Sequence, residues 1–183
     1  AQLQFWNASS TLGGLGFNLK SSRPALGEDN LTSTAFIGYF RTKLGKTTWK
    51  AEATYGQNMT DLLQIGGFGI NGGGDYENNE TLSMWTEFSG DFSETMEWGL
   101  FGGYAANGGF GESVTYVDGF LGTVENAFRV SPRIGWKSGS LKIGLEGEFT
   151  NAQYGSIATN GDITSTADSV NNFRLLTTAI YKF

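Results

Sequence analysis

Hydrophobic and polar residues alternate with a period of two along most of this chain. Between residues 34 and 44, Phe36 and Phe40 share one side of an extended segment, while Tyr39 and Arg41 share the other. Strict alternation over such lengths is typical of β-strands whose two faces meet different surroundings. No stretch of helical length shows a 3.6-residue period, so the pattern predicts an all-β fold.

The first clear hairpin joins residues 34–44 to residues 47–57 through Gly45-Lys46. A Gly-X dipeptide between two alternating runs is the signal of a two-residue β-turn. Pairing Leu44 with Thr47 keeps the apolar positions on one face, and a slip of one residue would mix the faces. The same register predicts that Arg41 lies directly across from Lys50.

A second hairpin is predicted around Gly139-Ser140. Pairing Ser138 with Leu141 sets Arg133 opposite Glu146, and opposite charges across a ladder stabilise this register. Pro132 cannot donate a ladder hydrogen bond, so we expect a β-bulge there. A third hairpin turns at residues 93–95, where the usual glycine is missing.

Together these patterns predict about eight strands in one domain that covers residues 1–183. The strands are expected at residues 2–7, 34–44, 47–57, 82–92, 96–104, 128–137, 141–150 and 172–183. The connections alternate between very short turns and long polar segments at residues 8–33, 58–79, 107–123 and 155–169. Short turns at one rim and long loops at the other are typical of outer-membrane barrels, and an even strand count would place both termini at the short-turn rim.

Composition removes several classes of function. The chain has no Cys, no His and a net charge of −6. It therefore lacks thiolate ligands and the commonest general base, and its acidity argues against a nucleic-acid partner. No nucleophile, base and orienting group assemble from the sequence, so we expect no enzyme, no cofactor and no metal site.

Aromatic residues tend to end each apolar stripe. The pairs are Trp49 and Tyr55, Trp98 and Tyr104, Phe128 and Trp136, and Phe173 and Tyr181. Six to eight residues of strand span roughly 20–26 Å, close to the apolar band of a transmembrane barrel between its two aromatic girdles. We therefore expect an antiparallel transmembrane β-barrel whose apolar face meets lipid. The alternative is a soluble sandwich whose core contains these aromatic residues.

The other face is charged and on balance basic. Its predicted bases are Arg41, Lys43, Lys50, Arg129, Arg133, Lys137, Lys142, Arg174 and Lys182, and its predicted acids are Glu52, Glu87, Glu97, Glu125, Glu146 and Glu148. If the apolar face meets lipid, this face is the lumen. The candidate pore-lining residues are Arg41, Lys50, Glu52, Glu87, Arg129, Arg133, Glu146, Glu148 and Arg174.

The last 60 or so residues resemble a known family. The run from Arg129 to Gly139, the run from Leu145 to Thr150 and the ending at 172–183 are similar to the C-terminal hairpin and last strand of DcaP-like porins. The resemblance implies a trimeric porin of about sixteen strands, of which this chain would be the C-terminal half, lacking the N-terminal part. It also implies that Tyr181 and the terminal Phe183 form the signal that barrel-assembly machinery recognises.

The leading hypothesis is therefore a porin of the bacterial outer membrane, in contact with lipid and lipopolysaccharide, through which small polar solutes diffuse. The track of Arg41, Lys50, Arg129, Arg133 and Arg174 predicts a preference for small anions. The alternative is a complete eight-stranded barrel that acts as a structural or adhesive anchor.

Overall fold

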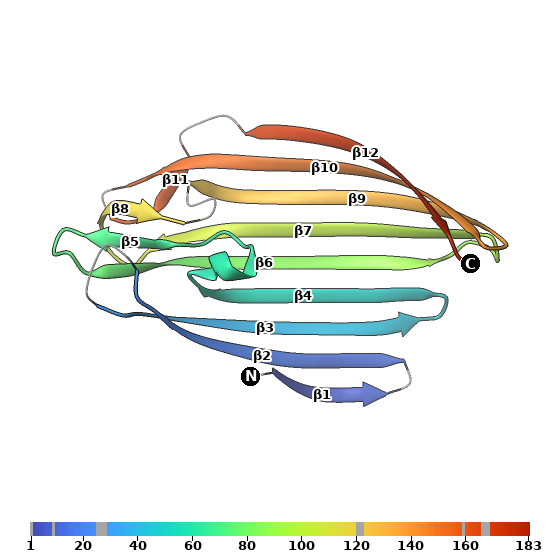
Figure 1. Ribbon diagram of the computed structural model, residues 1–183, viewed down its shortest axis with the longest axis horizontal. Helices are drawn as coiled ribbons and strands as arrows, with labels where there is room; N and C mark the ends of the chain where they lie inside the picture. Colours follow the sequence, from blue (N-terminus) through green and yellow to red (C-terminus); the bar gives the residue numbers. More distant parts are fainter. Residues whose placement is uncertain (1, 9, 25–28, 120–122, 159, 166–168) are drawn as a thin grey trace.

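A computed structural model describes residues 2–8, 10–24, 29–119, 123–158, 160–165 and 169–183. These residues form one antiparallel sheet of twelve strands and one short 3-10 helix (Figure 1). The prediction of an all-β antiparallel fold is confirmed. Within the described ranges, no helix has the length and apolar character needed to cross a membrane.

Nine strands of 7 to 17 residues lie side by side and form the body of the sheet. In spatial order they are β1 (Gln2–Ala8), β2 (Thr11–Ser22), β3 (Leu31–Leu44), β4 (Thr47–Gln57), β6 (Tyr76–Asp91), β7 (Met96–Phe110), β9 (Val124–Ser138), β10 (Leu141–Ile157) and β12 (Val170–Tyr181). Each strand is antiparallel to its neighbours. The remaining elements are β5 (Phe68–Asn71), β8 (Val114–Asp118), β11 (Ile163–Ser165) and the helix η1 (Met59–Leu62).

The short turns gather at one end of the sheet, on the right in Figure 1, and the C-terminus lies there too. The long connections leave from the other end, where they form β5, β8 and β11. In particular β5 pairs with both β6 and β8, so two connections are tied together beyond the main sheet. The predicted separation of short turns from long connections is confirmed.

The predicted connection at residues 8–33 is wrong, because it contains β2. This strand pairs along its whole length with β3, from Thr11 opposite Thr42 to Ser22 opposite Leu31. Gly13, Gly14 and Gly16 hide its alternation in the sequence. The body of the sheet therefore has nine strands instead of eight, and β1 and β12 run in the same direction. The expectation that both termini lie at the short-turn rim is also wrong, since Gln2 pairs with Gly16 midway along β2.

The other connections also contain more structure than predicted, because β5, β8 and β11 lie within them. Residues 9, 25–28, 120–122, 159 and 166–168 of the predicted connections lie outside the described residues.

Both two-residue hairpins adopt the predicted register. Leu44 pairs with Thr47 and Arg41 with Lys50, while Ser138 pairs with Leu141. Gly45 and Gly139 both have positive φ, which explains the glycine in each turn.

The bulge expected at Pro132 is wrong. The ladder between β9 and β10 skips Gly147 and Glu148 and then resumes in the same register at Phe149, opposite Val130. Pro132 also pairs in register with Leu100 of β7. The missing N–H of proline therefore removes ladder bonding locally without inserting an extra residue.

The third hairpin forms without a glycine because the Ser93 side chain hydrogen-bonds to the backbone of the turn. Its hydroxyl oxygen accepts hydrogen bonds from the backbone N–H groups of Thr95 and Met96 at 3.3 and 3.1 Å. The backbone N–H of Phe92 also donates to the carbonyl of Met96. A side-chain oxygen thus satisfies donors that the turn itself leaves free.

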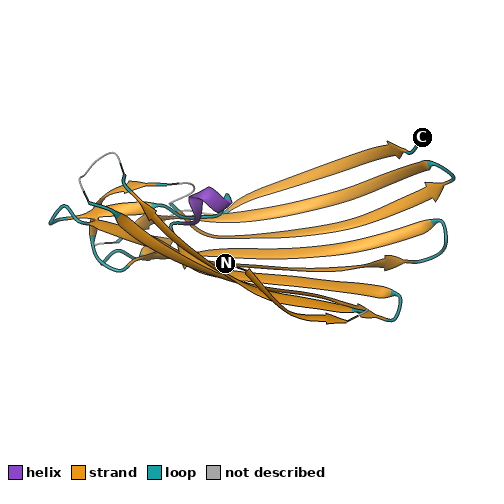
Figure 2. Cartoon of the chain, turned by 60° about the horizontal axis from the view of Figure 1, so that its bottom comes forward, coloured by secondary structure: helices purple, strands orange, loops and turns teal. Residues whose placement is uncertain are grey.

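The sheet has one apolar and one polar face. Figure 2 shows it as a single curved and twisted layer with η1 on one of these faces. Large side chains of the apolar face are exposed on β2, β3, β4, β6, β7, β9, β10 and β12: Leu15, Phe17, Leu19, Phe36, Tyr55, Met84, Leu100, Tyr104, Phe128, Val130, Trp136, Ile143, Leu145, Phe149, Phe173 and Leu175. No second layer covers them in the part of the chain that the structure describes. β1 and β12 are the two edges of the sheet, and their described residues do not pair with each other, so the sheet is open.

Candidate functional site

The polar face carries three groups of ion pairs, and two of them contain seven of the nine predicted lining residues. The first group centres on Glu87 of β6. Lys50 Nζ lies 3.0 Å from Glu87 Oε1, and Arg133 Nη1 lies 2.9 Å from Glu87 Oε2. Lys50 is the direct ladder partner of Glu87, but Arg133 reaches it from β9 across the whole width of β7.

Gly99 makes that crossing possible. A Cβ atom at Gly99 would lie 2.6 Å from the Arg133 guanidinium, closer than real Cβ contacts come. The arginine therefore lies flat on the glycine and extends to Glu87. The opposition of Arg133 and Glu146 is confirmed in the backbone register, but the Arg133 side chain forms its ion pair with Glu87 instead.

The second group joins β9, β10 and β12. Arg129 Nη2 lies 2.6 Å from Glu148 Oε2 and 3.4 Å from Glu146 Oε1. Arg174 Nη2 lies 2.8 Å from the same Glu148 oxygen. Glu148 is buried and has two arginines as partners, which offsets the cost of removing its charge from water.

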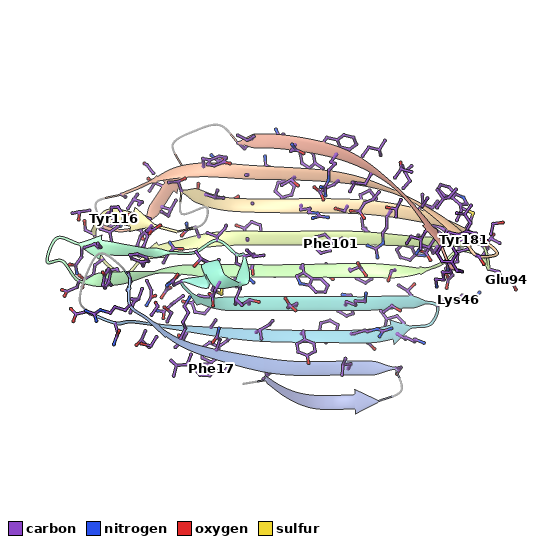
Figure 3. All side chains as sticks on the ribbon, in the orientation of Figure 1. Phe17, Lys46, Glu94, Phe101, Tyr116 and Tyr181 are labelled. Atoms are coloured by element: carbon purple, nitrogen blue, oxygen red, sulfur yellow. The ribbon has the colours of Figure 1, made fainter. Side chains whose placement is uncertain are left out.

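The third group lies nearer the short turns. Lys137 Nζ lies 2.9 Å from Glu97 and 3.1 Å from Asp91, and Lys142 pairs with the other oxygen of Glu97. Sequence analysis placed Glu97 and both lysines on this face but not among the lining candidates. Lys46 and Glu94 mark the same end of the sheet in Figure 3.

Arg41 and Lys50 lie opposite each other, as predicted, and Glu52 forms an ion pair with neither of them. Lys50 is paired with Glu87, and Glu52 Oε1 accepts a hydrogen bond of 3.2 Å from Trp85 Nε1. Arg41 forms no ion pair within the described residues, and Lys43, two residues further along β3, forms none either. Among the described bases assigned to the polar face, Arg41 and Lys43 on β3 and Lys182 beyond β12 therefore form no ion pair.

Two aromatic residues of this face were missed by sequence analysis. Trp85 and Phe101 are stacked, with centroids 6.0 Å apart and rings at 27°. Arg129 Cζ lies 5.3 Å from the centre of the Phe101 ring, a cation–π contact. Strict alternation along β6 and β7 would have placed both aromatic residues among the charges.

Residues 58–66, here called the covering segment, fold onto the polar face instead of extending away from it. At its far end the Thr81 hydroxyl donates to the carbonyl of Ile65, and the Ser83 hydroxyl donates to Gln64 Oε1, both at 2.7 Å. At its near end Lys20 of β2 donates to the carbonyl of Asn58 at 2.7 Å and pairs with Asp61 at 2.9 Å. Residues from β2 and β6 thus hold the segment across β3 and β4.

The predicted assembly signal lies at the C-terminus. Tyr181 and Phe183 are exposed, and their ring centroids are 5.5 Å apart. Tyr181 lies at the short-turn end of the sheet (Figure 3).

No group of three or more Asp or Glu side chains suited to holding a metal ion occurs within the described ranges. No family model, curated protein or solved structure matches the chain.

Proposed function

We propose that this chain forms part of the wall of an outer-membrane β-barrel, and that its polar face lines a water-filled passage for small polar solutes. One observation carries the proposal: the apolar face of the sheet is exposed, while the polar face is ion-paired and partly covered by residues 58–66. A soluble sheet would bury its apolar face against a second layer.

The size of the apolar face supports a lipid environment. Soluble monomers rarely expose a contiguous apolar patch above a few hundred Å². Here exposed apolar side chains extend over eight neighbouring strands, from Leu15 on β2 to Leu175 on β12. Lipid tails would cover this surface without a partner layer.

The open edges support closure into a barrel. In the hydrocarbon region every backbone N–H and C=O must be satisfied, so unpaired edges such as β1 and β12 are not tolerated there. We propose that further strands join the two edges, in a larger barrel of the DcaP-like trimeric kind that the sequence resembles. The fifteen charges predicted on the polar face favour a wide, wet lumen over the dry interior of an eight-stranded anchor.

Within this proposal the passage prefers small anions. The preference rests on Arg41 and Lys43, which form no ion pair within the described residues. Lipopolysaccharide, the barrel-assembly machinery and two further copies of the protein would be its partners.

This chain has no cysteine, so single labels can test the two faces once any cysteine elsewhere in the full-length protein is replaced by serine. Leu100→Cys on the apolar face and Ser89→Cys on the polar face would each carry a nitroxide label, in the full-length protein in outer-membrane vesicles. We expect the label at 100 to meet oxygen dissolved in lipid, and the label at 89 to meet a water-soluble nickel chelate. Equal access of the chelate to both positions would rule the proposal out.

A further inference from the structure

We infer that Trp85 and Phe101 form a stacking platform for the ring of a neutral sugar that passes along the polar face. This inference rests on the proposed function and names a solute class for the same wall. Phe101 lies near the middle of the sheet in Figure 3, far from both ends.

The platform is built by strand register. Glu52 of β4 pairs with Trp85 of β6, Trp85 with Gly103 of β7, and Gly103 with Arg129 of β9. These four residues therefore form one row across the polar face. A Cβ atom at Gly103 would lie 3.1 Å from the Phe101 ring, so the glycine provides the space over which that ring leans toward Trp85.

Neighbouring polar groups hold the two rings in place. The Trp85 indole N–H donates to Glu52, and the Arg129 guanidinium lies against Phe101. A fixed ring loses little conformational entropy when a ligand stacks on it. Both side chains are half-buried, so part of their surface remains accessible from the polar side.

The surroundings of the pair distinguish it from ordinary aromatic packing. The apolar face has an equivalent stack of Trp49 and Phe88, with centroids 5.6 Å apart and rings at 8°. Lipid contact explains that stack under the proposed function. No such explanation applies to Trp85 and Phe101, whose neighbours on the polar face are Glu52, Glu87 and Arg129.

The charge balance around the platform favours a neutral solute. Arg41 and Lys43 extend the same band on β3, two strands away from Trp85. On β4 to β12 the charged residues of the band are four bases, Lys50, Arg129, Arg133 and Arg174, and four acids, Glu52, Glu87, Glu146 and Glu148. Their charges cancel, and most are already paired. A sugar fits this combination, because one side of its ring presents C–H groups to the electron-rich face of an aromatic ring while its hydroxyls exchange hydrogen bonds with charged neighbours.

The covering segment lies next to the platform on the polar face. Gln64 of that segment is bound to Ser83, which lies two residues before Trp85 on the same side of β6. Because the segment packs directly on the sheet there, a solute passes along its edge, next to the aromatic pair.

The test is single-channel recording on the full-length protein from outer membranes, with maltotriose added to one chamber. We expect transient blocks of the current that become more frequent with maltotriose concentration and saturate. Sorbitol, which has hydroxyls but no ring, should give none. Trp85→Leu should raise the half-saturating concentration of maltotriose about tenfold, because one aromatic stacking contact is lost.

Trp49→Leu is the matched control, because it removes the same ring from the equivalent stack on the other face. It should leave the half-saturating concentration unchanged. Equal blocks by sorbitol, or no effect of Trp85→Leu, would overturn the inference while the open channel still supported the proposed function. Absence of any channel would overturn both.

Discussion

Replacing Leu100 by arginine tests which face of the sheet meets lipid. Leu100 is 44% exposed on β7, and its ladder partners are Phe88 and Pro132. If this face were in water, an exposed leucine could become arginine at a cost within about 0.5 kcal/mol. If it meets hydrocarbon near the midplane, the same change costs about 2–4 kcal/mol, because the guanidinium loses its hydration.

The two cases are far enough apart to be separated by urea unfolding. With a denaturant slope of about 2 kcal/mol per molar, a loss of 2–4 kcal/mol lowers the midpoint by about 1–2 M. The assay is urea titration of the protein folded in lipid vesicles, followed by tryptophan fluorescence and by heat-modifiable migration on gels.

Ser89→Arg provides the control with the same new charge. Ser89 lies on the polar face of β6, between Glu87 and Asp91 on the same side of the strand. The added guanidinium stays in water there. It lies between two carboxylates and next to the Arg133 guanidinium over Gly99, so attraction and repulsion partly cancel and we expect little change in the midpoint. If Leu100→Arg and Ser89→Arg shift the midpoint equally, the assignment of the apolar face to lipid is refuted.

Three further predictions concern the polar face. Gly99→Val should displace Arg133 from Glu87 and cost about 1–3 kcal/mol as overpacking, and the loss should shrink in an Arg133→Ala background when both are measured by urea unfolding. Lys20→Met should change global stability by less than about 1 kcal/mol, because its pair with Asp61 is partly exposed, yet limited chymotrypsin digestion should cleave the covering segment faster. Arg41→Ala should shift the reversal potential under a KCl gradient toward cation preference, and an unchanged potential would exclude Arg41 as the source of anion preference.

Sequence alternation predicted most of the fold because each strand carries its own face pattern. The hairpins at Gly45 and Gly139 adopt the expected register, since a slip would have exchanged the two faces. β2 was not predicted because its glycines present no side chain to either face. Among its large apolar residues, only Leu15, Phe17 and Leu19 show the alternation, over five residues in the middle of the strand.

The site was less predictable because side chains cross strands. Ladder register placed Glu146 opposite Arg133, but an extended arginine also reaches two strands away when a glycine lies between. The choice of Glu87 depends on the space over Gly99, which no pairwise pattern in the sequence reveals. The position of the covering segment could not be predicted from the sequence either, because the residues that bind it, Lys20, Thr81 and Ser83, are far from it in the chain.

Pairing, more than composition, decides the electrostatic character of the polar face. The chain carries a net charge of −6, while its polar wall has more bases than acids. The ion pairs of Glu87, Glu97 and Glu148 neutralise the middle of the wall and its β9–β12 side. Within the described residues, the two bases of β3, Arg41 and Lys43, form no ion pair. An attraction for anions would therefore act along β3, while a neutral ring could rest on Trp85 and Phe101 without competing for the same groups.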